Sequence, residues 1–322
     1  MRSSYRLSVL KNDKEMLSIL IPTYNYVCTD LVCDLQKQAA RLDCPYEILV
    51  ADDGSAETFK SANRAISSMP CCKYVELPDN VGRARIRNIL GRMARYDWLL
   101  FMDCDAVVVR EDFLARYMAA RLQAKVIYGG LVHPARLPSP DVTLSYYYEK
   151  NAEPRFTPER RMKHPYKVFR TFNFMVERTT FLAHPFDEEI AMYGHEDTLF
   201  GKGLQDGGIP ILHIDNPLLN NGLDKSLPFL DKTEESLRTL YVHREKLAGH
   251  SGVLNLYAHL ERRGCSRLVA GLFRLLRKAL RRNLTGSHPS LYLYAFYKIG
   301  YFCMLSRKGA IFLTGEEQNA HR

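Results

Sequence analysis

The run WLLFMDCDAVVV, residues 98–109, places two carboxylates inside an otherwise apolar stretch. Desolvating a charge costs several kcal/mol unless something pairs with it, so Asp103 and Asp105 must lie at the end of a buried strand or bind a cation. Residues i and i+2 of a strand point the same way, so both aspartates can face one site while Cys104 faces the core. At about 5 Å and an effective dielectric of about 20 their repulsion is roughly 3 kcal/mol, which a divalent cation removes. Oxygen ligands suit Mg²⁺ or Mn²⁺, and two solvated carboxylates in a turn are the alternative.

Around this run, short apolar stretches alternate with helical ones up to about residue 130. The stretches are apolar throughout, which indicates a mostly parallel sheet covered by helices on both faces. In such sheets, ligands bind beyond the carboxyl ends of the strands. The expected strands are residues 17–22, 47–52, 73–78 and 98–103, and the expected helices are residues 29–42, 58–68 and 83–94.

The pattern changes after residue 130. Residues 131–175 are rich in Pro, Tyr and Arg and only weakly periodic, which predicts a long loop. The alternation resumes with a strand at residues 171–178, a helix at 196–205 ended by Gly207-Gly208, and a strand at 209–215.

Two other motifs end strands at the same expected edge, LIPTYN and VADDGS. Tyr24 could stack on a flat base, and Thr23 or Asn25 could form hydrogen bonds with it. Asp52 and Asp53 precede a Gly-Ser turn, where aspartates also serve as turn formers and helix caps. Each motif alone is therefore compatible with a packed aromatic or a structural turn.

Five motifs together resemble the inverting glycosyltransferases of family two: ILIPTYN (19–25), LVADDGS (49–55), NVGRARIRN (80–88), FMDCDA (101–106) and GHED (194–197). The resemblance covers roughly residues 15–240 and implies a GT-A fold, an α/β class with a Rossmann-like, mostly parallel sheet and flanking helices. The expected parts are a glycosyltransferase domain at 1–245, with a nucleotide-sugar half at about 15–130 and an acceptor half at about 131–245, and a C-terminal helical tail at 246–322.

The resemblance also assigns roles on the donor side. Asp53 would accept a hydrogen bond from the uracil ring, and Arg83 or Arg87 would meet the diphosphate or position it. Asp103 would contact the ribose or a metal-bound water, and Asp105 would ligate the metal that joins the two phosphates. The residues bordering the nucleobase would be Pro22, Tyr24 and Asn25.

On the acceptor side, the resemblance implies that Glu196 holds the acceptor and that Asp197 is the general base. His195 would touch the acceptor or fix the loop. A sugar hydroxyl is a poor nucleophile and needs a carboxylate to take its proton, and direct displacement with one base predicts inversion at the anomeric carbon. An acidic first turn that complements the helix dipole is the alternative for this pair.

One position departs from the family pattern. The resemblance implies a histidine metal ligand beyond the helix that carries Glu196, but the chain has Asn220 and Asn221 in that region. His213 on the preceding strand is a candidate substitute, although a lone strand histidine is also typical of a packed core. We expect a divalent cation, Mn²⁺ or Mg²⁺, bound by Asp105 and Asp103 with His213 as the candidate third ligand.

The net charge of +9 is concentrated near the C-terminus. Residues 262–315 hold eleven Lys and Arg and no Asp or Glu, whereas residues 1–261 carry a net charge of −1. Residues 266–284, SRLVAGLFRLLRKALRRNL, have the pattern of a basic amphipathic helix at a membrane interface. Packing against the body and nucleic-acid binding are the alternatives, and no recognised nucleic-acid module accompanies the arginines. The apolar face would comprise Leu268, Leu272, Leu275, Leu276, Ala279 and Leu280.

Cysteine usage and hydropathy favour a cytoplasmic location. The eight cysteines form no CxxC and no zinc-spaced cluster, which is typical of reduced thiols. The first apolar run, residues 16–22, is too short for a signal peptide, and no run reaches the ~18 residues of a spanning helix. With the basic tail, this predicts a peripheral enzyme on the inner face of the cell membrane.

The resulting hypothesis is a metal-dependent hexosyltransferase of bacterial polysaccharide biosynthesis. It would move a sugar from a nucleotide donor, UDP-linked, to a hydroxyl of a glycan or lipid-linked glycan, with an anionic membrane surface and no nucleic acid as partner. A nucleotidyltransferase, which attacks the α-phosphate and releases pyrophosphate, is one alternative. A catalytically weak, nucleotide-sugar-binding subunit of a glycan assembly complex is the other.

Overall fold

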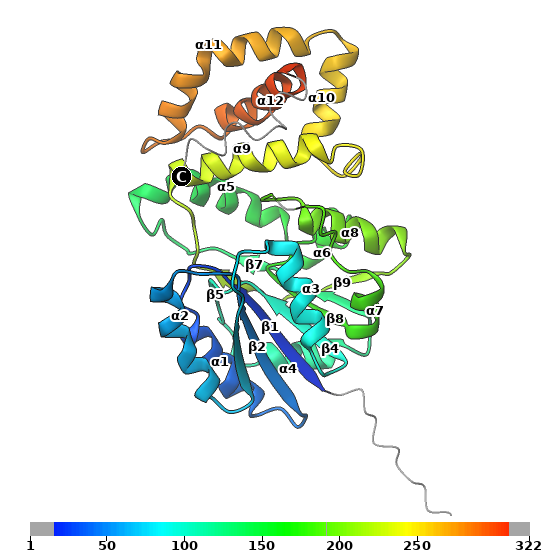
Figure 1. Cartoon of the computed structure of the whole chain (residues 1–322). Helices are drawn as coiled ribbons and strands as arrows, with labels where there is room; N and C mark the ends of the chain where they lie inside the picture. The colour runs from blue at the N-terminus through cyan, green and yellow to red at the C-terminus, as the bar shows by residue number, and fades with distance from the viewer. Residues whose placement is uncertain (1–15, 191, 309–322) are drawn as a thin grey trace, which may run out of the picture.

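A seven-stranded sheet forms the centre of the computed structural model, which describes residues 16–190 and 192–308. The strand order is β3-β2-β1-β4-β8-β6-β9 (Figure 1). The first four strands in the sequence run parallel, so their carboxyl ends meet at one edge and confirm the expected α/β class. They are β1 (Leu17–Thr23), β2 (Tyr46–Asp52), β3 (Cys72–Glu76) and β4 (Trp98–Met102).

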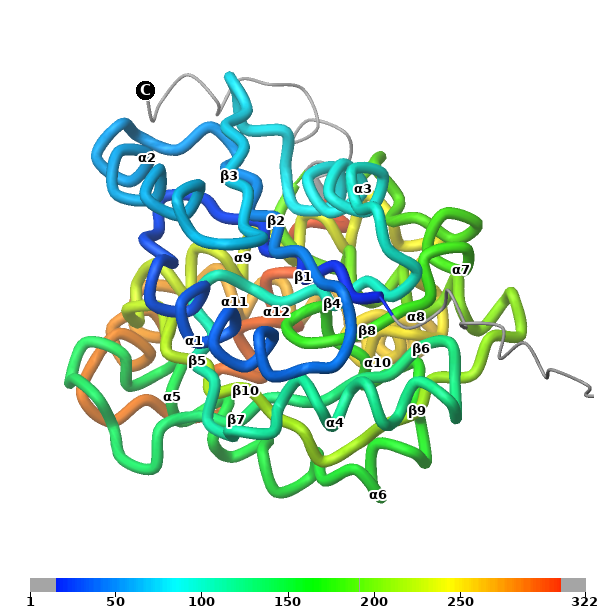
Figure 2. The backbone as a smooth tube through the Cα atoms, turned by 90° about the horizontal axis from the view of Figure 1, so that it is seen from below, coloured from blue at the N-terminus to red at the C-terminus, as the bar shows by residue number. Residues whose placement is uncertain are grey.

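Helices cover both faces of the sheet, as strands without polar alternation require. On one face, α1 (Thr29–Ala39) and α4 (Phe113–Ala120) pack against the sheet. On the other face, α3 (Arg83–Met93), α7 (Arg178–Ala183) and α8 (Glu196–Asp206) build a second core. Figure 2 shows α1 and α4 on one side of the strands and α3 and α7 on the other. The expected helix at 58–68 is α2 (Glu57–Asn63) followed by a 3₁₀ turn (Arg64–Ser68).

The remaining strands of the large sheet extend it beyond β4. β8 (Asn173–Glu177) is antiparallel to both β4 and β6 (Val126–Tyr128). β9 (Ile211–His213) pairs parallel with β6 and forms the edge. The strands predicted at 171–178 and 209–215 are therefore present in shorter form.

A second, three-stranded sheet brings a distant segment back to the aspartates of the opening motif. Its strands are β5 (Ala106–Val107), β10 (Leu218–Asn220) and β7 (Leu131–Val132), in the order β5-β10-β7. Asn220 pairs with Ala106, so the residues that follow β10 lie next to Asp105.

The segment 131–175 is not the long loop that its sequence predicts. It contains α5 (Thr143–Ala152) and the short α6 (Pro158–Arg161). Leu144 of α5 is fully buried in a third core, and its backbone N–H donates to the Ser226 hydroxyl at 3.2 Å. Tertiary packing therefore stabilises this helix, and its own weak periodicity gives little sign of it.

Four further helices lie on the side of the sheet to which the parallel strands point (Figure 1). The third core joins them to α5, and the boundary expected between residues 245 and 246 falls inside this helical layer. Within residues 16–190 and 192–308, no helix is both long and apolar enough to cross a bilayer. The four helices are α9 (Ser226–Val242), α10 (Gly252–Arg262), α11 (Ser266–Leu284) and α12 (Leu291–Lys308).

Candidate active site

The loops after β1 and β2 are joined to each other at the carboxyl edge of the sheet. Asn25 adopts a positive φ of 49°, and its side-chain oxygen accepts from the Ala56 N–H at 2.9 Å. The Asn25 N–H donates to the Ser55 hydroxyl at 2.8 Å. Pro22 is half-buried beside this junction, and Tyr24 is 52% exposed. The aromatic ring is thus exposed at the carboxyl edge of the sheet.

The two adjacent aspartates after β2 have different surroundings. Asp52 is fully buried and accepts from the Ser55 N–H at 2.7 Å and the Tyr74 hydroxyl at 2.8 Å, so it holds the turn. Asp53 accepts from the backbone N–H groups of Val81 at 2.7 Å and Gly82 at 3.1 Å. Burial raises the pKa of Asp53, although these two hydrogen bonds act against the increase. Asp53 therefore anchors the start of α3.

α3 directs two arginines toward Asp103. The Arg87 guanidinium is 2% exposed, contacts Asp103 Oδ1 and donates to the Arg83 carbonyl at 3.0 Å. Arg83 is 44% exposed and donates to Asp103 Oδ2 at 3.2 Å. Arg87 is therefore paired inside the protein, whereas Arg83 lies where a ligand can reach it.

Arg83 also reaches the second acidic motif. Its Nε lies 2.6 Å from Glu196 Oε1, so one guanidinium bridges the loop after β4 and the first turn of α8. Burial alone would raise the pKa of Glu196, but the charges of Arg83 and Arg87 hold it below its ordinary value. This bridge brings motifs 93 residues apart, at Asp103 and Glu196, into one site.

Of the two aspartates in the DCD motif, Asp105 has the negative charge that is less well neutralised by neighbouring side chains. Burial and the charge of Asp103 raise its pKa to about 6, whereas Cys104 packs against the core. Among the described residues, no side chain donates to its carboxylate. The Asn221 N–H donates to its carbonyl at 3.3 Å, and a methyl group on Gly222 would lie 1.8 Å from Asp105 Oδ2.

These features fit a divalent cation. A partly buried carboxylate whose pKa is raised by a neighbouring carboxylate gains stability when a cation binds, and its oxygen donors suit Mn²⁺ or Mg²⁺. Asn220 and Asn221, which replace the expected histidine, do lie beside Asp105. Over residues 16–190 and 192–308, however, no three His, Cys, Asp or Glu side chains gather into a set that could hold a metal. The protein would thus supply few of the ligands.

His213 is not a metal ligand, so the expectation from sequence that it would be the third ligand was wrong. It ends the edge strand β9, three strand spacings of about 4.8 Å from β4. Its Nε2 lies 3.0 Å from the Pro165 carbonyl oxygen, and its ring packs edge-on against Tyr128 with the centroids 5.2 Å apart. Burial, together with the charge of Arg161, lowers the pKa of His213 to about 4. This histidine is a packed core residue.

Asp197 follows Glu196 in the first turn of α8. Burial and the charge of Glu196 raise its pKa to about 6, and its Oδ1 accepts from the Thr198 N–H at 2.6 Å. His195 precedes the helix with a positive φ of 70°, and its Nε2 lies 3.2 Å from the Ser236 hydroxyl of α9. The helix start is thereby fixed against the C-terminal layer, with a carboxylate of near-neutral pKa beside it.

Three further residues near these carboxylates carry weak sequence signals. The charge of Arg170 acts against the increase that burial and Glu196 cause in the pKa of Asp197, and the Arg170 guanidinium is paired with Glu149 of α5 at 3.0 Å. The Tyr193 ring lies 5.9 Å below the Arg83 guanidinium and 5.6 Å from the Lys232 ammonium group. Asp224 adds a small contribution to the pKa increase that burial and Asp103 cause at Asp105, and it is itself paired with Lys232 at 2.7 Å. None belongs to a sequence motif, so only the fold connects them with the site.

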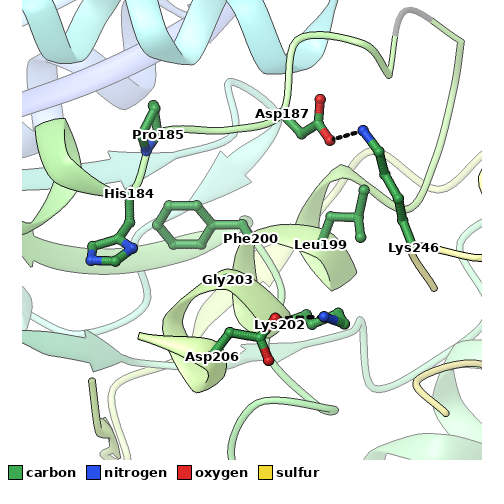
Figure 3. Close-up of a pocket in the computed structure, with 9 residues that line it drawn as sticks. All are labelled: His184, Pro185, Asp187, Leu199, Phe200, Lys202, Gly203, Asp206 and Lys246. Carbon is green, nitrogen blue, oxygen red and sulfur yellow. Dashed lines mark hydrogen bonds and ion pairs between the residues drawn. The ribbon is translucent and has the colours of Figure 1, made fainter. Parts of the chain in front are cut away.

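A pocket of about 300 Å³ lies elsewhere, on the outer side of α8. Figure 3 shows that its lysines already point at acidic partners, Lys246 at Asp187 and Lys202 at Asp206. Because these charges are compensated, we assign no ligand to it.

Sequence comparison identifies a family and several relatives of this chain. The profile of the family described as Glycosyl transferase family 2 matches residues 18–182, half of the chain. Validoxylamine A glucosyltransferase of Streptomyces hygroscopicus is 28% identical over 224 residues, covering 61% of this chain and 53% of that protein. Chondroitin synthase of Escherichia coli is 39% identical over 93 residues, covering 28% of this chain and 13% of that protein. The chain therefore spans only part of the length of these relatives.

A solved structure shares the fold over nearly the whole chain. The mannosyltransferase from Pyrobaculum calidifontis, in complex with GDP-Man and Mn²⁺, superposes with a TM-score of 0.53. The alignment covers 92% of this chain and 87% of that one at 13% sequence identity. At this identity the likeness concerns the fold alone.

Proposed function

The chain belongs to glycosyl transferase family 2, and on that premise we propose that it moves a sugar from a nucleotide donor to a hydroxyl acceptor. The donor is UDP-linked, and the acceptor is a glycan or a lipid-linked glycan. The enzyme works at the inner face of the cell membrane. Residues up to about 130 bind the donor and the following ones, up to about 245, bind the acceptor.

One observation carries this proposal, the bridge that Arg83 forms between Asp103 and Glu196. It joins the motif expected to bind the diphosphate with the motif expected to hold the acceptor. A site that transfers a group between two substrates needs both motifs at a single reacting centre.

In the proposed reaction, the acceptor oxygen bonds to the anomeric carbon as the bond from that carbon to the β-phosphate oxygen breaks. The electron pair leaves with the nucleoside diphosphate, and Asp197 takes the proton of the attacking hydroxyl. A single displacement inverts the anomeric configuration. The exposed Arg83 guanidinium stabilises charge that develops on the leaving group. Asp105 and Asp103 would hold a divalent cation, which supplies further positive charge to the diphosphate.

A panel of nucleotide sugars tests the donor. The thermal midpoint of the purified protein is measured with each compound, with and without Mn²⁺. We expect one UDP-sugar to raise the midpoint in the presence of Mn²⁺, because a ligand that binds only the folded state stabilises it by mass action. A shift with GDP-sugars alone contradicts the UDP assignment, and release of pyrophosphate from the donor contradicts glycosyl transfer.

The raised pKa of Asp197 predicts a pH dependence. Below about pH 6 the carboxyl group is protonated and cannot accept the proton of the hydroxyl, so the rate should fall tenfold per unit. Above this pH the carboxylate is charged, and the rate should reach a plateau. The measurement is kcat/KM for the acceptor at saturating donor and Mn²⁺. Under these conditions, weaker donor binding at low pH cannot cause the expected fall in rate. A flat profile between pH 5 and pH 8 would contradict the assignment of the base.

A further inference from the structure

The outer face of α11 exposes a row of leucines to solvent. Leu268 is 73% exposed, Leu272 44%, Leu275 79% and Leu276 37%. Leu272 lies four residues after Leu268, and Leu275 and Leu276 lie three and four residues after Leu272, so the leucines form a continuous stripe along the helix. A surface helix normally turns such a stripe toward the core.

The rotation of α11 is fixed by its opposite face. Ala270, Phe273, Leu280 and Leu284 are buried there in the cores shared with α12, α9 and α5. The aromatic ring of Phe273 fits against Gly300, where an added methyl group would lie 2.7 Å from the ring. Leu280, expected on the same face as the other leucines, belongs to this inner side. The helix therefore has two apolar stripes, and only one of them is buried.

Two inward arginines strengthen this orientation. Arg277 pairs with Glu234 of α9 at 3.0 Å, and Arg281 pairs with Glu234 at 3.0 Å and with Asp231 at 2.9 Å. Glu234 is buried, and Tyr297 of α12 also donates to it. Turning the leucines inward would leave this carboxylate buried without its partners, which is costly.

The exposed stripe is bordered by basic residues on one side. At 100° per residue, Arg282, Lys278, Arg267 and Arg274 occupy the sector next to the leucines. Among the residues that the structure describes, Arg274, Lys278 and Arg282 form no ion pair. No acidic residue occurs between residues 262 and 315, so their charge is not offset along the chain. The outer face of α11 thus combines free positive charge with exposed leucines.

We propose that this outer face, Leu268, Leu272, Leu275 and Leu276 with the basic row Arg267, Arg274, Lys278 and Arg282, docks the protein on an anionic lipid surface. An interfacial helix buries its leucines at the boundary of headgroups and acyl chains, while its cationic side chains meet the lipid phosphates. Charge complementarity selects this occupant, because a second copy of the chain would bring one basic row against another. Figure 1 places α11 at the end of the molecule farthest from the sheet, where a flat surface can reach it.

This inference rests on the proposed function only in that the enzyme works at the membrane. It adds that the outer face of α11 is the surface that binds the lipids. It can be tested without donor or acceptor. The full chain is mixed with vesicles of phosphatidylcholine and phosphatidylglycerol, or of phosphatidylcholine alone, and the bound fraction is measured by flotation. We expect binding to the anionic vesicles only, weakening as salt is added.

Two pairs of substitutions separate the contributions of the two rows. Lys278→Gln with Arg282→Gln should weaken vesicle binding roughly 30-fold, from the contribution of each basic residue near an anionic surface. Leu268→Ser with Leu275→Ser should weaken it by roughly 10-fold per leucine. Both pairs are exposed, so the thermal midpoint should not change, and a donor-induced midpoint shift should persist in both variants.

Matched controls lie on the sheet half of the molecule. Leu122 is 83% exposed just after α4, and Arg41 and Lys73 are exposed on the same half. Leu122→Ser and the pair Arg41→Gln with Lys73→Gln should leave vesicle binding unchanged. Equal binding to neutral and anionic vesicles, or equal losses in the control variants, would overturn the proposal. So would a dimer in light scattering that the leucine pair converts to a monomer while vesicles are not bound.

Discussion

Replacing Asp197 by asparagine is expected to lower kcat by about 10²- to 10⁴-fold, the usual contribution of a general base. Asparagine keeps the size of the side chain and can still accept from the Thr198 N–H. It cannot take the proton of an attacking hydroxyl. The acceptor hydroxyl would then have to lose its proton to water, and the residual rate should no longer fall below pH 6.

The matched control is Asp206→Asn at the other end of α8. Asp206 is exposed, and its ion pair with Lys202 is a surface pair of the kind that contributes little to stability. This variant should retain wild-type kcat. Donor binding, followed by the midpoint shift, should survive in both variants because neither residue is placed on the donor side. An Asp197→Asn enzyme within threefold of wild type would exclude this residue as the base and favour a nucleotidyltransferase. Absence of turnover in the wild-type protein with every donor tested would instead favour a non-catalytic subunit.

The parallel half of the fold could be predicted because its local signals agree with its final packing. Strands β1, β2 and β4 are buried on both faces, so their apolar runs contain little else, and the polar residues that follow mark the carboxyl edge. That edge then collects the motifs containing Tyr24, Asp53 and Asp103. The assignment of Arg83 or Arg87 to one role could not be settled in this way, because their burial depends on how α3 packs against Phe186 and α8.

The predictions that were wrong concern residues whose positions are set by contacts with segments distant in the sequence. Ser226 and the third core hold α5 in place, and its Tyr-rich sequence does not predict these contacts. His213 could be expected near a metal only if β9 were beside β4, but the order of the sheet inserts β8 and β6. The sequence pattern of α11 groups its leucines correctly, yet it does not say which of its two apolar stripes meets the core.

Asp105→Asn should abolish the part of donor binding that depends on Mn²⁺. Exchanging an anionic oxygen ligand for an amide removes the charge that holds a cation, and it also removes the repulsion with Asp103 that raises the pKa of Asp105. We expect the Kd of the donor in Mn²⁺ to rise about 100-fold or more, because even second-layer partners of metal ligands typically contribute 10- to 100-fold. The midpoint without ligands should not fall. The exposed Asp34→Asn on α1 should leave both quantities unchanged.

Gly222→Ala tests the same carboxylate from its other side. The added methyl group would lie 1.8 Å from Asp105 Oδ2, so the carboxylate must rotate away from its present position. Gly222 is not among the residues with positive φ, so alanine brings no backbone strain, and the midpoint without ligands should be preserved. Gly203→Ala is the control, because a methyl group there meets nothing within 4 Å. If both Asp105→Asn and Gly222→Ala keep the Mn²⁺-dependent shift, the DCD motif is a turn stabilised by arginines. Donor binding must then rest on Arg83 and the loops after β1 and β2. If both lose it while Gly203→Ala does not, the position of the Asp105 carboxylate governs the use of the cation.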